Sequence, residues 1–191
     1  MKLQVALSFL LFACNLCYSQ TVLKTYTWEE AQKQHIDSVF SITFEKEKID
    51  SLPIALMSYT QLKKLDLSKQ KIKNLPEDFS KLKNLEELNL GKNKLTRFPT
   101  QICLLSNLRE LNLNRNYFET VPECIENLTK LEMLDLWATP VGNFPEQITK
   151  LNSLKLLDLR GIKYSPKFQD QWSSKLSWVK IEFDAPCDCY D

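Results

Sequence analysis

LNLNRNYFETVPECI (residues 111–125) and LDLWATPVGNFPEQI (residues 134–148) stand 23 residues apart and keep their leucines, proline and isoleucine in register. The Leu-Xaa-Leu triplet that opens each stretch recurs at the same interval, beginning at Leu65, Leu88, Leu111, Leu134 and Leu157. A fixed period of this length is the signature of a repeat architecture. The spacing therefore predicts a stack of similar units.

Each copy can be numbered from the residue three places before its triplet, which gives starts at Val39, Leu62, Leu85, Leu108, Leu131 and Leu154. Apolar residues recur at copy positions 1, 4, 6, 11, 14, 18 and 21, with proline at position 15, and the first and last copies are degenerate. The alternating triplet predicts a short strand with inward leucines, paired in parallel with the next copy. Because one copy cannot bury its own apolar face, the copies must share one core.

Position 9 of the copies is polar although its neighbours are apolar. Asn93 and Asn116 occupy it in two successive copies, and we expect their side-chain amides to turn inward and satisfy backbone groups of adjacent turns. Gln70 is an imperfect substitute, and Thr139 offers only a hydroxyl group. The sequence thus predicts a structural asparagine ladder at Asn93 and Asn116.

The pattern LxxLxLxxNxLxxLPxxIxxLxx resembles the 23-residue form of the leucine-rich repeat family, over residues 39 to about 183. This resemblance implies an α/β solenoid, a curved horseshoe with a parallel sheet on its concave face and short helical turns on its convex face. It also implies that binding takes place on the concave strand face. The style of the repeat suggests a bacterial protein that acts outside the cytoplasm.

Both ends of the predicted solenoid carry candidate caps. Thr27-Trp28-Glu29-Glu30 is a capping box, which predicts a helix that runs to about His35 and covers the exposed edge of the first strand. Ser165-Pro166 predicts the start of a second helix, and WVKIEF (residues 178–183) predicts a closing strand. The expected organisation is an N-terminal cap over 20–38, repeats over 39–175, and a closing strand with a cysteine-containing tail over 176–191.

Residues 1–19 read as a secretory signal peptide, with Lys2 before the apolar run VALSFLLFAC and cleavage after Ser19. The run is too short to be a transmembrane segment. An alternative is lipidation at Cys14, because Leu11-Phe12-Ala13-Cys14 resembles a bacterial lipoprotein box. Removal of residues 1–19 lowers the formal net charge from +1 to zero, since Lys2 is their one charged residue. No nucleic-acid partner is therefore expected.

Four cysteines remain after such a cleavage. Cys103 and Cys124 lie on the predicted convex side of neighbouring copies, where a bridge between them is allowed but not required. Cys187 and Cys189 form a CxC pair in the tail, and a link between these two is the favoured disulfide. Two thiolates supply half of a tetrahedral site, so neither a metal ion nor another cofactor is expected.

The residues that point outward from the predicted strands define a candidate ligand patch. Met133, Trp137 and Leu156 are apolar in columns that are otherwise polar, and adjacent strands lie about 4.8 Å apart. The patch is completed by three charged neighbours, Asp135, Asp158 and Arg160. The competing interpretation is that Trp137 packs toward Arg160 and the C-terminal cap.

A second candidate surface is a basic rim at copy position 8, made of Lys46, Lys69, Lys92 and Arg115, with Lys48, Lys71 and Lys94 two positions further on. Such a rim would attract an acidic polysaccharide, a lipid headgroup layer or an acidic protein. The competing interpretation is a solvated face neutralised by Asp66, Glu87 and Glu110.

These observations favour a non-enzymatic module that is secreted or periplasmic and binds a protein or glycan outside the cytoplasm. With three glycines the chain has no phosphate-binding loop, and no serine or cysteine triad is spaced with His35. No catalytic residue is therefore assigned. The alternative is an outer-membrane or cell-surface lipoprotein, lipidated at Cys14, that serves as a scaffold or adhesion protein.

Overall fold

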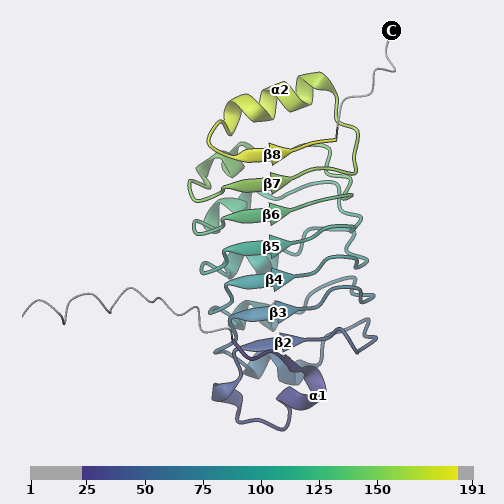
Figure 1. Ribbon diagram of the computed structural model, residues 1–191, viewed down its shortest axis with the longest axis vertical. Helices are drawn as coiled ribbons and strands as arrows, with labels where there is room; N and C mark the ends of the chain where they lie inside the picture. Colours follow the sequence, from purple (N-terminus) through teal and green to yellow (C-terminus); the bar gives the residue numbers. More distant parts are fainter. Residues whose placement is uncertain (1–22, 185–191) are drawn as a thin grey trace, which may run out of the picture.

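The computed structural model describes residues 23–184, which form one solenoid (Figure 1). Its eight strands build a single sheet in which every strand pairs in parallel with the next along the chain. The strands are β1 (Tyr26–Thr27), β2 (Ser41–Thr43), β3 (Lys64–Asp66), β4 (Glu87–Asn89), β5 (Glu110–Asn112), β6 (Met133–Asp135), β7 (Leu156–Asp158) and β8 (Lys180–Glu182). The predicted parallel sheet is confirmed.

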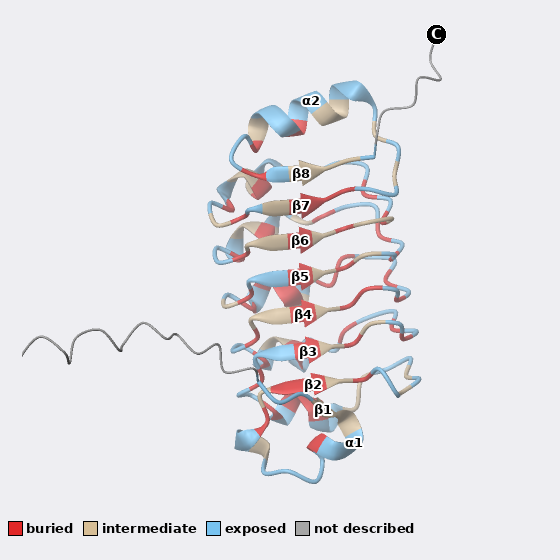
Figure 2. Ribbon diagram, viewed as in Figure 1, coloured by how far each residue is buried: buried red, intermediate tan, exposed pale blue. Residues whose placement is uncertain are grey.

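The strand register follows the 23-residue period. Leu65, Leu88, Leu111, Leu134 and Leu157 are paired in sequence across β3 to β7, and Leu157 pairs with Ile181 in β8. The five leucines are at most 2% exposed, because each points into the space between sheet and convex side. Figure 2 shows this buried row crossing the strands. The leucine triplets thus build one continuous core, as the period predicts.

The convex side consists of short 3-10 helices, one in each full copy. They are η2 (Ile54–Ser58), η3 (Glu77–Lys81), η4 (Thr100–Leu104), η5 (Glu123–Asn127) and η6 (Glu146–Lys150). Proline stands directly before each of them with φ between −64° and −77°, as in Pro53 and Pro122. The proline ring holds the chain in the conformation from which the turn starts. This is the predicted role of copy position 15.

The position-9 side chains lie inside the solenoid and bridge copies. Asn93 Oδ1 accepts from Ile72 N at 3.1 Å, and its Nδ2 donates to Leu67 O at 2.8 Å. Gln70 makes the equivalent pair of bonds one copy earlier, so its longer side chain serves as well as asparagine. Thr139 donates to Leu113 O at 3.1 Å and accepts from Asn116 N at 3.4 Å.

The N-terminal end differs from the sequence-based expectation. The capping box at Thr27 and Glu30 is present, but α1 spans only Trp28–Ala31, and a separate 3-10 helix, η1 (Ile36–Ser38), follows. The chain must reverse within this segment to enter β2, so a helix continuing to His35 does not form. The edge of β2 is covered by β1 instead of α1, because Tyr26 and Thr27 pair with Ile42 and Thr43.

The C-terminal end consists of α2 (Pro166–Lys175), whose N-terminus is capped by the Ser165 side chain, and β8, which lies inside the expected stretch 178–183. Trp172 of α2 is 1% exposed. Its ring packs edge-on against Phe144 with centroids 5.4 Å apart. This aromatic contact attaches the helix to the last copies.

Candidate functional site

The outward side chains of the strands bring the residues of the predicted patch onto neighbouring strands. Met133 pairs with Leu156 and Asp135 pairs with Asp158 across β6 and β7. Met133 and Leu156 are half-buried. The sheet therefore places an apolar pair beside a pair of carboxylates on the concave face, with Trp137 two residues after β6 and Arg160 two residues after β7.

Trp137 faces the preceding copy. The Arg115 guanidinium lies over its ring, 4.2 Å from the ring centroid. The backbones of the pair are joined, because Arg115 N donates to Trp137 O at 2.8 Å, and Trp137 N donates to the side-chain oxygen Asp135 Oδ1 at 2.9 Å. Within residues 23–184, the ring contacts of the C-terminal cap join Phe144, Tyr164, Phe168, Trp172 and Phe183 and do not include Trp137.

Arg160 is bound by acidic groups on its own and the next strand. Its Nη2 lies 2.5 Å from Asp158 Oδ2 and 3.1 Å from Glu182 Oε2. Hydrogen bonding to Asp158 raises the pKa of the guanidinium. Burial raises the pKa of the Asp158 carboxyl, but the hydrogen bonds from Arg160 outweigh it and leave the pKa below its ordinary value. This ion cluster closes the C-terminal side of the patch.

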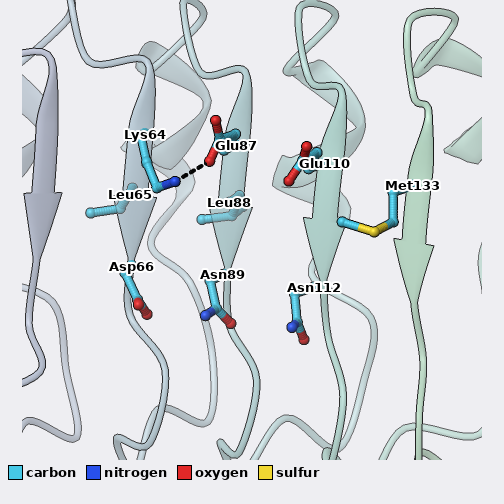
Figure 3. A pocket seen from close by; sticks show the side chains of 9 residues that line it. All are labelled: Lys64, Leu65, Asp66, Glu87, Leu88, Asn89, Glu110, Asn112 and Met133. Carbon is cyan, nitrogen blue, oxygen red and sulfur yellow. Dashed lines mark ion pairs between the residues drawn. The ribbon is translucent and has the colours of Figure 1, made fainter. Parts of the chain in front are cut away.

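A hollow of 240 Å³, not anticipated from the sequence, adjoins the patch on the concave face (Figure 3). Lys64 and Glu87 form an ion pair across it, and their hydrogen bond raises the pKa of Lys64. Burial, followed by repulsion from Glu87, raises the pKa of Glu110. The hollow is lined by Lys64, Leu65, Asp66, Glu87, Leu88, Asn89, Glu110, Asn112 and Met133. In the sequence, only the mixed charges at copy position 3 could have indicated this hollow.

The basic rim has an unusual backbone. Lys69, Lys92 and Arg115 have φ values of 60°, 58° and 50°, in the left-handed region, and Ala138 and Gly161 continue the series. Their backbone N–H groups bond to the next copy, as Lys92 N does to Asn114 O at 2.8 Å. Lys46, at the same position of the first copy, is exposed and does not have positive φ.

Two of the three acids expected to neutralise this rim are engaged elsewhere. Glu87 pairs with Lys64, and Asp66 Oδ1 accepts from Ser68 N at 2.8 Å. Among residues 23–184, no ion pair joins Lys69 or Lys92 to an acidic side chain. The neutralised-face interpretation therefore lacks its expected contacts.

The cysteines that the structure describes lie on the convex side. The Sγ atoms of Cys103 in η4 and Cys124 in η5 are 2.19 Å apart, and their Cα atoms are 5.7 Å apart. The favoured partners Cys187 and Cys189 lie outside the described residues, as does Cys14.

Stacked copies with a single parallel sheet, a shared leucine core and an open inner face define a solenoid repeat protein. Proteins of this class use such extended surfaces for binding other molecules. A family model described as a leucine-rich repeat region matches residues 44–176. The chain therefore belongs to the leucine-rich repeat family, as its sequence pattern predicted.

Solved structures share the fold. A leucine-rich repeat protein of Leptospira interrogans aligns with a TM-score of 0.65 and 24% identity, over 77% of this chain and 43% of that one. An internalin, InlF, from Listeria monocytogenes aligns with a TM-score of 0.60 and 21% identity, over 79% of this chain and 42% of that one. The chain thus spans less than half of either protein. No curated protein matches it significantly.

No helix within 23–184 is long and apolar enough to cross a bilayer. Within the same range, no three His, Cys, Asp or Glu side chains gather as a metal-binding group.

Proposed function

We propose that this protein is a non-enzymatic interaction module that acts outside the cytoplasm and binds a protein on its concave face. The contact surface consists of Met133, Trp137 and Leu156, flanked by Asp135, Asp158 and Arg160. The stacked Arg115–Trp137 pair is the observation that carries this proposal, because it holds a large aromatic ring in place just beyond the carboxyl end of β6.

Three properties of the patch support a binding role. Tryptophan, methionine and arginine are the residue types enriched in the centres of protein interfaces. The Trp137 ring is stacked with Arg115 and its backbone N–H is bonded to the Asp135 carboxylate, so less conformational entropy remains to be lost on binding. The adjoining hollow with its Glu110 carboxylate offers a place for a basic side chain of the partner.

Export rests on residues 1–19, which lie outside the described range. Cleavage after Ser19 leaves a secreted or periplasmic protein, whereas lipidation at Cys14 leaves an envelope-anchored scaffold or adhesion protein. The intact mass of the protein from its native host distinguishes them, because lipidation adds the mass of the acyl chains and places Cys14 at the N-terminus.

The concave patch is tested by capture from the extracytoplasmic fraction of the source organism, with Trp137→Ala/Met133→Ser compared to the native sequence. The matched control is Trp178→Ala/Leu104→Ser, because Trp178 and Leu104 are 46% and 58% exposed and lie outside the patch. We expect the patch variant to lose at least 90% of the captured partner and the control to retain it.

The melting temperature of both variants is measured alongside. We expect the patch variant to melt within about 4 °C of the native protein, which corresponds to about 1 kcal/mol in a domain of this size. Full capture by a folded patch variant would refute the proposal. Loss of folding by that variant would show that Trp137 is a structural residue and would contradict it equally.

A further inference from the structure

A run of cations without acidic residues lies in the loops that follow β3 and β4. The segments KQKIKN (residues 69–74) and KNKLTR (residues 92–97) contain six cations and no acidic residue, although the whole chain has a net charge of only +1. We call this set the basic ridge: Lys69, Lys71, Lys73, Lys92, Lys94 and Arg97.

The six ridge cations are exposed and have no acidic partner in the described chain. Lysines elsewhere behave differently, since Lys81, Lys150 and Lys175 pair with Asp78, Glu126 and Glu146. Like charges gathered on adjacent loops repel one another across distances below the Debye length of about 8 Å. A polyanion that covers the ridge therefore lowers its electrostatic free energy.

Backbone bonds between copies align the ridge residues in rows. Lys94 N donates to Ile72 O at 2.9 Å and Tyr117 N donates to Leu95 O at 2.8 Å, so Lys71, Lys94 and Tyr117 follow one another across three copies. Lys69 and Lys92 form a parallel row with φ values of 60° and 58°. Glycine or asparagine adopts this conformation at less cost than lysine does, so the backbone does not explain the choice of lysine there.

Two hollows are lined in part by residues of the ridge. One of 430 Å³ is lined by Lys73, Asn74, Lys94, Thr96 and Tyr117. The other, of 160 Å³, shares Asn74 with the first and includes Arg97. Tyr117 is 61% exposed beside the lysines. The larger hollow combines an aromatic ring, an amide, a hydroxyl and two ammonium groups. The aromatic ring matches the ring face of an acidic sugar, the amide and hydroxyl match its hydroxyls, and the ammonium groups match its carboxylates.

We propose that the basic ridge and its two hollows bind a linear acidic polysaccharide, with Lys73 and Lys94 on its carboxylates and Tyr117 against a sugar ring. A lipid bilayer fits less well, because the exposed Ile54 and Leu104 that would insert into it lie on the convex helices. A polypeptide of glutamate or aspartate would use the ammonium groups but has no ring to place against Tyr117. The site shares no residue with the proposed protein-binding patch, so either proposal can fail alone.

The test measures binding of fluorescently labelled polygalacturonate oligosaccharides to the whole exported chain. Neutral dextran, poly-glutamate and vesicles of phosphatidylglycerol and phosphatidylcholine serve as comparison probes. We expect polygalacturonate to bind, dextran not to bind, and affinity to fall at least tenfold between 50 and 300 mM NaCl. Lys73→Gln/Lys94→Gln should bind at least tenfold more weakly than the native protein.

The matched control is Lys130→Gln/Lys167→Gln, which removes two charges from exposed lysines outside the ridge and should change the affinity less than twofold. Tyr117→Ala should weaken polygalacturonate binding about fivefold and leave poly-glutamate unaffected, and Tyr117→Phe should bind as the native protein does. Melting curves confirm that each variant is folded. No binding of polygalacturonate, an equal loss in the control, or stronger binding of the vesicles or of poly-glutamate would overturn the proposal.

Discussion

Replacement of Asn116 by alanine is the sharpest test of how the copies are held together. The Asn116 side chain is 2% exposed. Its Oδ1 accepts from Leu95 N at 3.1 Å, and its Nδ2 donates to Leu90 O at 3.0 Å and to Leu113 O at 2.9 Å. Both carbonyls keep a second donor after the replacement, from Asn93 and Thr139 respectively, whereas Leu95 N loses its acceptor.

The expected cost follows from this difference. A buried backbone N–H left without an acceptor costs about 1–3 kcal/mol, and each lost bond to a still-satisfied carbonyl costs about 0.5–1 kcal/mol, so Asn116→Ala should destabilise the protein by about 3 kcal/mol. Thr139→Ala should cost about 2 kcal/mol, because it leaves the buried Asn116 N without its acceptor, which that N–H reaches only through a long bond of 3.4 Å, and removes one of the two donors to Leu113 O. Asn116→Gln should recover much of the loss, since Gln70 makes equivalent bonds at copy position 9.

Urea unfolding followed by circular dichroism gives these free energies, provided that the slope against denaturant is the same in all variants. The predicted order of stability is native, Thr139→Ala, then Asn116→Ala. The reasoning fails if Asn116→Ala is as stable as Thr139→Ala, or if Asn116→Gln is no better than the alanine variant. Either outcome would mean that the amide contributes little beyond filling space.

Reduction of the Cys103–Cys124 bridge should lower the free energy of unfolding by about 3 kcal/mol, as expected for a loop of this length; urea curves with and without dithiothreitol measure it, and equal curves would show that the thiols are not joined. Glu110→Gln should raise the melting temperature at pH 7 and not at pH 4, because the raised pKa of Glu110 means that its charged form, present above that pKa, is unfavourable in the fold. A stabilisation that persists at pH 4 would contradict this cause. Arg115→Ala and Trp137→Ala should show a coupling free energy of about 0.5–1 kcal/mol in a double-mutant cycle, and additive effects would show that the stack contributes nothing.

The repeat was predictable because its physical cause is periodic. A leucine that must point inward recurs every 23 residues, so one copy determines the register of the next, and the pairing of Leu88 with Leu111 could be read from the sequence. The same holds for the prolines before the convex helices. The capping box at Thr27 was equally readable, since it depends on two residues three apart.

The features that the sequence did not reveal depend on single tertiary contacts. Strand β1 has two residues, Tyr26 and Thr27, and belongs to no repeat, so only its pairing with β2 defines it. The left-handed conformation at copy position 8 could not be predicted, because lysine and arginine occupy that position in three copies. Of the residues at this position, only Gly161 is of a type that commonly adopts positive φ. The Trp137 side chain could contact either Arg115 or Arg160, and the spacing of these residues in the sequence does not decide between the two contacts.

The Arg115–Trp137 stack also bears on how two copies stay joined. Where Asn93 and Asn116 each link copies with an amide, Thr139 has one hydroxyl and makes fewer bonds. The stack joins the same two copies from the outside, and its free energy of about 0.5–1 kcal/mol is comparable to that of one neutral hydrogen bond. Stability in a solenoid is a sum of neighbour terms, so a surface contact can offset an interior one. The Trp137 ring is therefore ordered in the unbound protein. Under the proposed binding role, Arg115→Ala should bind the partner more weakly, because this variant keeps the ring but no longer holds it.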